Sequence, residues 1–144
     1  VGGEGRARGG GGLAERGGVA GILFWPILRT EGQPMANDLL RHIEHAIDVC
    51  GEDHVGIGGD NSISGVPMTP EYRKDNAEFM QMLLEDGTLT PGRSTDLVTF
   101  LPDLNHPRRF ETIAAMLSSR GHTDARSAKV LGGNCARVVR EVWG

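Results

Sequence analysis

The chain has few of the residues that cross-link small proteins or bind nucleic acids. It contains two cysteines, Cys50 and Cys135, which cannot build a disulfide framework or a four-thiolate zinc site. We expect both to be small buried residues. Fifteen basic residues against nineteen acidic ones, a formal net charge of −4, argue against the clustered basic surface that a nucleic acid requires.

Long hydrophobic runs are also missing. No apolar segment approaches the ~20 residues that a membrane span requires. Residues 1–18 have no apolar core of the kind found in a signal peptide. We therefore expect a soluble chain without a transmembrane segment, cytoplasmic by default.

Glycine, in contrast, is abundant, and its excess is local. The chain has 22 glycines, and nine of them lie within residues 1–18. Glycine loses more backbone entropy on folding than any other residue, and this segment has little apolar surface to bury. We predict that residues 1–18 are disordered and that residues 19–144 form the folded segment.

Two short apolar segments, residues 19–25 and 54–60, predict buried strands. Between them, Asn37 and Asp38 can cap a helix that ends at Gly51. A strand–helix–strand unit of this length predicts parallel strands joined by a right-handed crossover. Because a lone parallel pair leaves two unpaired edges, these strands are expected to belong to a larger sheet and to favour self-association of the chain.

Three further helical regions follow. The first begins at Thr69–Pro70, the second at His106–Pro107, and the third at Thr123 with an interruption at residues 132–134. Helical spacing predicts the buried residues of the first two regions, which are Tyr72, Phe79, Met80, Leu83, Leu84, Phe110, Ile113, Ala114 and Leu117.

Asp60 is the sharpest candidate for a catalytic group. It follows Gly58 and Gly59 at the end of the second predicted strand. Enzymes with parallel sheets place catalytic groups just past the carboxyl ends of their strands. The alternative is that Asp60 caps a turn or the next helix. A dinucleotide-binding loop at this point is disfavoured, because the third glycine is missing and the carboxylate would repel a pyrophosphate.

Other polar residues have a structural explanation. His42 and His45 are three positions apart on the first predicted helix, a spacing that can share a metal ion, but surface histidines are the favoured interpretation. Arg108 and Arg109 could bind a substrate carboxylate through paired hydrogen bonds. The favoured interpretation is a solvated helix turn after His106, since proline suits the first helical position.

Five segments occur together in an order and spacing that resemble a known family. They are Gly17–Ile22, His42–Ile47, Asp53–Asp60, Asn105–Arg109 and Leu131–Val138. Their combination is similar to the C-terminal part of the membrane dipeptidase (renal dipeptidase) family of zinc peptidases, over a match that runs from about Leu13 to Gly144.

The resemblance implies an α/β fold, namely the C-terminal part of a (β/α)₈ barrel of the metal-dependent hydrolase type. Residues 19–25 and 54–60 would be the last two of its strands, since a complete barrel needs about 250 residues. It also implies two zinc ions, whose ligands precede the matched region, so no residue of this chain is assigned as a metal ligand. Asp60 matches the aspartate that carries protons in this family.

In that family, the aspartate takes a proton from the attacking water and passes it to the leaving amine of a dipeptide. Ser62 stands where relatives often have a second aspartate, and no substrate-binding residue is assigned. Two functions follow. The first is that the chain is part of a zinc-dependent dipeptidase, an enzyme that hydrolyses dipeptides, and that the 144-residue chain alone is inactive. Alternatively, it is a non-catalytic fragment or interaction module that lacks the metal ligands.

Overall fold

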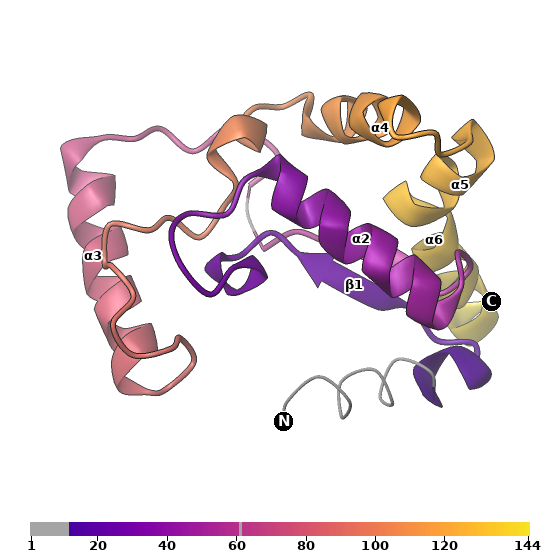
Figure 1. Ribbon diagram of the computed structural model, residues 1–144, viewed down its shortest axis with the longest axis horizontal. Helices are drawn as coiled ribbons and strands as arrows, with labels where there is room; N and C mark the ends of the chain where they lie inside the picture. Colours follow the sequence, from indigo (N-terminus) through magenta and orange to yellow (C-terminus); the bar gives the residue numbers. More distant parts are fainter. Residues whose placement is uncertain (1–11, 61) are drawn as a thin grey trace. The chain divides into compact units, whose positions relative to one another are not determined.

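The structure, a computed structural model, describes residues 12–60 and 62–144. Within these residues, helices and two short strands form an α/β arrangement, whose course along the chain can be followed by colour in Figure 1. A helical turn over residues 12–15 precedes the first strand. The elements that follow are β1 (Ala20–Leu23), η1 (Pro26–Leu28), α2 (Ala36–Cys50), β2 (Val55–Gly58), α3 (Pro70–Glu85), η2 (Pro102–Leu104), α4 (Arg109–Ser119), α5 (Asp124–Ala128), η3 (Lys129–Gly133) and α6 (Asn134–Trp143).

Two compact units make up the chain. The sheet unit takes its described residues from Val1–Leu23, Leu40–Gly58 and Phe110–Gly144. The α3 unit comprises Phe24–Leu39 and the described residues of Gly59–Arg109. The division predicted from the sequence places a boundary at residue 18, and residues 1–11 of that segment lie outside the described residues.

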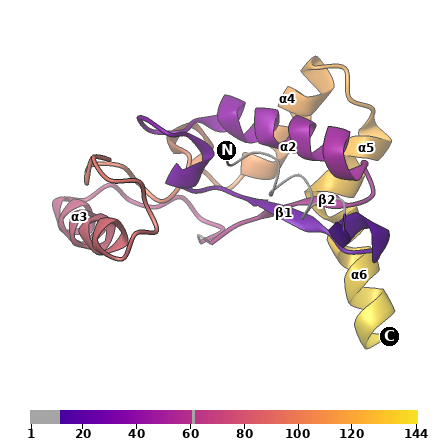
Figure 2. The same cartoon turned by 60° about the horizontal axis from the view of Figure 1, so that its bottom comes forward.

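In the sheet unit, β1 and β2 pair in parallel, as the sequence predicts, with Ala20 opposite Val55 and Leu23 opposite Gly58. The part of α2 that belongs to this unit runs along one face of the strands (Figure 2). The buried apolar side chains of the unit include Leu40, Ile43, Val55, Ile113, Leu117 and Val130.

Both strands are shorter than the sequence predicts, with four residues each. In the described part of the chain, each strand has one edge without a strand partner. Self-association through these edges stays a prediction, which sedimentation velocity over a range of concentrations would check.

Among the described residues, no helix combines the length and the hydrophobicity that a membrane span requires.

The α3 unit has a small core around one face of its helix. Met80 and Leu83 of α3 pack with Leu89 and Leu97, and Trp25 lies against them. As predicted, Thr69 caps α3, because its Oγ1 accepts a hydrogen bond from the Tyr72 N–H at 3.1 Å.

Polar side chains form hydrogen bonds with backbone N–H and carbonyl groups in the irregular segments of this unit. Gln33 accepts from the Val98 N–H at 2.8 Å and donates to the Phe100 carbonyl at 3.0 Å. Asn105 bonds both the N–H and the carbonyl of Val66, at 2.7 and 2.9 Å. These contacts replace the ladder that a strand would provide.

Two aromatic residues predicted to be buried are exposed. Phe110 is 45% exposed because the inward stripe of α4 passes through Arg109, Ile113 and Leu117, at successive spacings of four. Phe79 is 37% exposed and forms a T-shaped pair, at a centroid distance of 6.2 Å, with Trp25, which itself packs against the core.

Three more side chains differ from the prediction. Arg109 is 5% exposed rather than solvated, because its guanidinium donates to the carbonyls of Ile63 and Ser64, both at 3.2 Å. Cys135 is exposed and Cys50 is half-buried. At the start of α6, Asn134 takes the inward position instead of Cys135.

Candidate functional site

The carboxyl end of β2 carries the candidate catalytic group. β2 ends at Gly58, and Asp60 follows two positions later as an exposed residue. Around Gly59, a Cβ atom would meet nothing within 4 Å, so the backbone before Asp60 is open to an approaching molecule. Among the described residues, Asp60 has no hydrogen-bond or ion-pair partner. A carboxylate in this state is available for proton transfer.

The structural alternative for Asp60 is a cap on a turn or on the next helix, and the structure tests the helix cap. That helix is α3, and its cap is Thr69. Within the described residues near Asp60, Ser62 and Ser64 bond each other through their Oγ atoms at 2.7 Å. Asp60 therefore does not cap α3.

The opposite end of β2 is held by charged side chains. Glu52 accepts from Arg126 Nε and from Lys129 Nζ, both at 2.7 Å. Lys129 also pairs with Asp53 at 2.7 Å. Hydrogen bonds from Lys129 and then Arg126 lower the pKa of the Glu52 carboxyl, and those to Asp53 and Glu52 raise the pKa of the Lys129 ammonium.

Asn134 completes this end of the strand. Its side chain is 3% exposed, and its Nδ2 donates to the carbonyls of Glu52 at 2.7 Å and Val55 at 2.8 Å. Arg137, one turn further along α6, donates to the carbonyls of Asp53 and Gly17, both at 3.1 Å. We call Glu52, Asp53, Arg126, Lys129, Asn134 and Arg137 the anchor cluster.

A second charged group ties α2 to the turn after α4. The Oε2 atom of Glu44 pairs with Arg120 Nη1 at 2.6 Å. The Oε1 atom of Glu44 lies 3.3 Å from His122 Nε2. The second ring nitrogen of His122 lies 3.4 Å from Arg126 Nη1. This arrangement orients the imidazole between a carboxylate and a guanidinium, so its role is structural.

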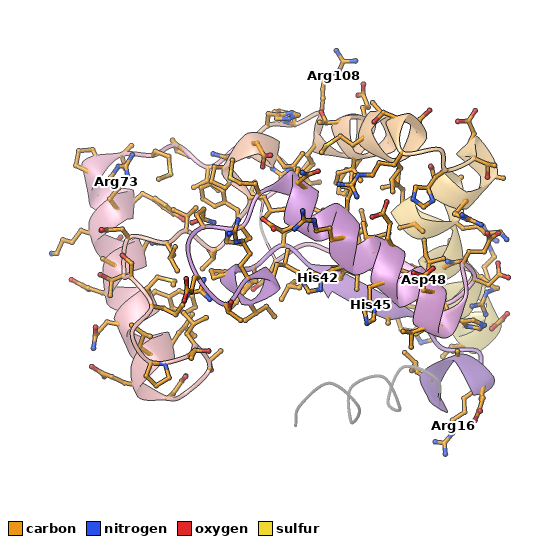
Figure 3. All side chains as sticks on the ribbon, in the orientation of Figure 1. Arg16, His42, His45, Asp48, Arg73 and Arg108 are labelled. Carbon is orange, nitrogen blue, oxygen red and sulfur yellow. The ribbon has the colours of Figure 1, made fainter. Side chains whose placement is uncertain are left out.

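The other polar residues singled out in the sequence are not brought together. His42 and His45 are exposed on α2, and Arg108 is exposed at the start of α4 (Figure 3). His106 is half-buried, and its backbone carbonyl accepts a hydrogen bond from Arg109 Nε. Throughout residues 12–60 and 62–144, no group of three or more His, Cys, Asp or Glu side chains could hold a metal ion. The described residues therefore do not fit the zinc ions that the resemblance implies.

Asp60 does not line either of two hollows in the structure. A wide groove of ≈520 Å³ lies on the anchor cluster, and it is lined by Asp53, Ala125, Ala128, Lys129, Gly133, Asn134 and Arg137. A smaller pocket of ≈100 Å³ lies in the α3 unit, and it is lined by Met68, Arg73, Asn76, Asp96 and Val98.

Sequence reasoning missed the anchor cluster. Asn134 follows Gly132 and Gly133. The sequence predicts a break in the last helix at this triplet, which is also part of the Leu131–Val138 segment, and it predicts no buried contact for Asn134. The break is real, since Gly132 has a non-helical backbone (φ 161°, ψ −24°) inside a π-helical turn. A polar amide directly after such a break is the signal that could have predicted a buried contact.

One protein family and several solved structures are similar to this chain. The sequence pattern of the membrane dipeptidase family (peptidase family M19) matches residues 12–91, more than half of the chain. Among solved structures, an amidohydrolase from Pseudomonas aeruginosa has a TM-score of 0.68 and 23% identity, over 96% of this chain and 40% of that chain.

Two metallopeptidases are similar as well. Dipeptidase AC, a member of family M19, has a TM-score of 0.63 and 20% identity, covering 96% of this chain and 32% of its own. A metallopeptidase from Rhodobacter sphaeroides, solved with a phosphinate mimic of the dipeptide L-Ala-D-Ala, has a TM-score of 0.62 and 21% identity over 95% of this chain. This chain spans 31–40% of the length of these structures. On the family match, the chain belongs to the membrane dipeptidase family, peptidase family M19.

Proposed function

We propose that this chain is the C-terminal part of a metal-dependent dipeptidase barrel, with β1 and β2 as its last two strands and Asp60 as its acid/base. The observation that carries the proposal is the open carboxylate directly after a parallel strand, in a chain of this family. In parallel sheets, this position is where catalytic groups are placed.

Asp60 would act in hydrolysis as a carrier of one proton. As the oxygen of water attacks the peptide carbonyl carbon, the carboxylate accepts the proton that the water loses. When the C–N bond breaks, the protonated carboxyl gives that proton to the leaving amine, which restores the carboxylate. The exposure of Asp60 suits this role, because the carboxylate has no competing partner among the described residues.

The described residues do not provide a ligand set for the family's zinc ions. The role proposed for this chain is therefore limited to the proton transfers of Asp60. We expect no turnover of dipeptides by the 144-residue chain alone.

The test compares two proteins, the 144-residue chain and the longest protein encoded by the reading frame that contains it. Each is purified, its bound metal is counted, and hydrolysis of a set of dipeptides that includes L-Ala-D-Ala is measured. In the longer protein, Asp60→Asn should lower kcat by about 10²–10⁴-fold with little change in KM, because only proton transfer is lost.

Asp75→Asn is the matched control, since Asp75 is an exposed aspartate on α3. Full activity of the Asp60→Asn variant would refute the catalytic role of Asp60. Absence of hydrolysis by a metal-loaded longer protein would refute the dipeptidase and leave the non-catalytic module as the function.

A further inference from the structure

The small pocket of the α3 unit has features of a ligand site that the proposed hydrolysis does not use. Its volume of ≈100 Å³ corresponds to the space of about three waters at ~30 Å³ each. This is below the several hundred Å³ of a pocket for drug-sized molecules, so it suits only a very small ligand. Asp60 does not line it.

Two opposite charges line the pocket without neutralising each other. Arg73 lies in the first turns of α3 (Figure 3), and Asp96 lies in the segment after α3. Neither the guanidinium of Arg73 nor the carboxylate of Asp96 has a hydrogen-bond or ion-pair partner among the described residues. Both residues are exposed, so their charges can meet a ligand without a large desolvation cost.

Asn76 provides a polar group in the same lining that is held in place by hydrogen bonds. The residue is 8% exposed, and its Nδ2 donates to the Leu97 carbonyl at 2.8 Å. Its Oδ1 accepts from the Tyr72 hydroxyl at 3.3 Å. A carboxamide has two N–H donors and two lone pairs on its oxygen, so one donor and one lone pair stay available.

We propose that this pocket binds a small zwitterion, an amino acid of the size of glycine or alanine. The carboxylate of the ligand would pair with Arg73, which can donate two parallel hydrogen bonds. The ammonium would pair with Asp96, and the remaining capacity of Asn76 would orient either group. Met68 and Val98 supply the apolar wall for a hydrogen or a methyl side chain.

The proposal is independent of hydrolysis, because binding at this pocket requires neither Asp60 nor a metal ion. Its ligand class is nevertheless that of the smallest products a dipeptidase releases. A failure of the hydrolysis assay would therefore leave this site untouched, and a failure of binding here would leave the role of Asp60 untouched.

The test titrates the ¹⁵N-labelled 144-residue chain with glycine, L-alanine and D-alanine, and follows its amide signals by NMR. Acetate and methylamine serve as ligands that carry only one of the two charges. We expect saturable binding of at least one amino acid at up to about 50 mM, with shifts that include the Asn76 side-chain amide. Each single-charge ligand should bind at least about tenfold more weakly.

Variants then assign each charge. Arg73→Gln should weaken amino acid and acetate binding by about tenfold or more and leave methylamine unchanged. Asp96→Asn should weaken amino acid and methylamine binding and leave acetate unchanged. Arg16→Gln and Asp48→Asn are matched controls, because both residues are exposed and lie in the sheet unit. Thermal melts confirm that every variant is folded.

Three outcomes would overturn the proposal. One is the absence of saturable shifts with all three amino acids at about 50 mM. Another is amino acid binding that neither Arg73→Gln nor Asp96→Asn weakens. The third is acetate binding as tight as that of alanine and insensitive to Asp96→Asn, which would identify an anion site instead.

Discussion

The two ends of β2 differ in how their polar groups are used. At the amino end, Glu52, Lys129 and Asn134 form ion pairs and hydrogen bonds of 2.7–2.8 Å that connect the strand to η3 and α6. At the carboxyl end, Asp60 is exposed and has no partner among the described residues. The side chains at the amino end of β2 therefore stabilise the fold through their contacts, whereas the carboxylate after its carboxyl end makes no such contact with the described residues.

The difference separates residues that stabilise the fold from residues that are free for chemistry. A group that accepts two strong hydrogen bonds, as Glu52 does, is a poor acid/base, because its charged form is stabilised and its pKa is lowered. An exposed carboxylate without partners can accept and release a proton.

Asn134→Ala should cause the largest loss. It removes both donors that satisfy the carbonyls of Glu52 and Val55, and the side chain is buried. Leaving two carbonyls without donors should lower the free energy of unfolding by about 2–4 kcal/mol. Urea denaturation followed by circular dichroism measures it. Gln81→Ala, at an exposed position of α3, is the control, and a loss below about 1 kcal/mol for Asn134→Ala would mean that water replaces the amide.

Gly56→Ala and Gly58→Ala compare two positions of the same strand. A Cβ at Gly56 would lie 3.0 Å from Cys135 Sγ and 3.1 Å from Val19 Cγ1, whereas at Gly58 the nearest atom, Leu23 Cδ1, is 3.8 Å away. Gly56→Ala should therefore lower stability by about 1–2 kcal/mol through overpacking. Gly58→Ala should be neutral or stabilising by about 0.4–1 kcal/mol, because alanine restricts the unfolded chain. Equal effects in thermal melts would contradict the contrast between the two ends.

Glu52→Gln should change the pH dependence of stability. The folded protein lowers the pKa of Glu52 below its ordinary value of 4.5. Its contribution is therefore fully present above about pH 4.5 and is lost as the pH falls through the folded pKa. The melting temperature of the variant should lie below that of the parent at pH 7, and the two should converge as the pH falls below the folded pKa of Glu52. Glu78→Gln, whose ion pair with Lys74 is long at 3.9 Å and exposed, should follow the parent throughout.

The sequence predicted the elements that local chemistry determines. The helix between the strands and the Thr69 cap depend on residues close in the chain, and the parallel pair follows from the strand–helix–strand order. All three are confirmed. The errors concern contacts between distant segments. Arg109 is buried because residues more than 40 positions earlier offer carbonyls, and Phe110 is displaced outward as a result. No local pattern contains that information.

The candidate site divides in the same way. Asp60 could be singled out because its position after a strand is visible in the sequence. The partners of Glu52 lie 74 and 77 positions further along, so neither the anchor cluster nor the pocket at Arg73 and Asp96 could be predicted from spacing. Long-range pairing of this kind depends on how the units fold, which single-sequence periodicity does not report.

Asp60→Asn gives the smallest expected change in stability and the sharpest test of the contrast. Because Asp60 is exposed and has no partner among the described residues, its neutralisation should alter the free energy of unfolding by less than about 0.5 kcal/mol. If the proposed function holds, the same substitution should remove most of the hydrolysis by the longer protein, since the proposed proton carrier is lost. A stability loss comparable to that of Asn134→Ala would make Asp60 a structural residue like those at the amino end of β2. Urea denaturation of the parent and the variant, side by side with the hydrolysis assay, separates these outcomes, because a structural aspartate would lower activity only in proportion to the fraction unfolded.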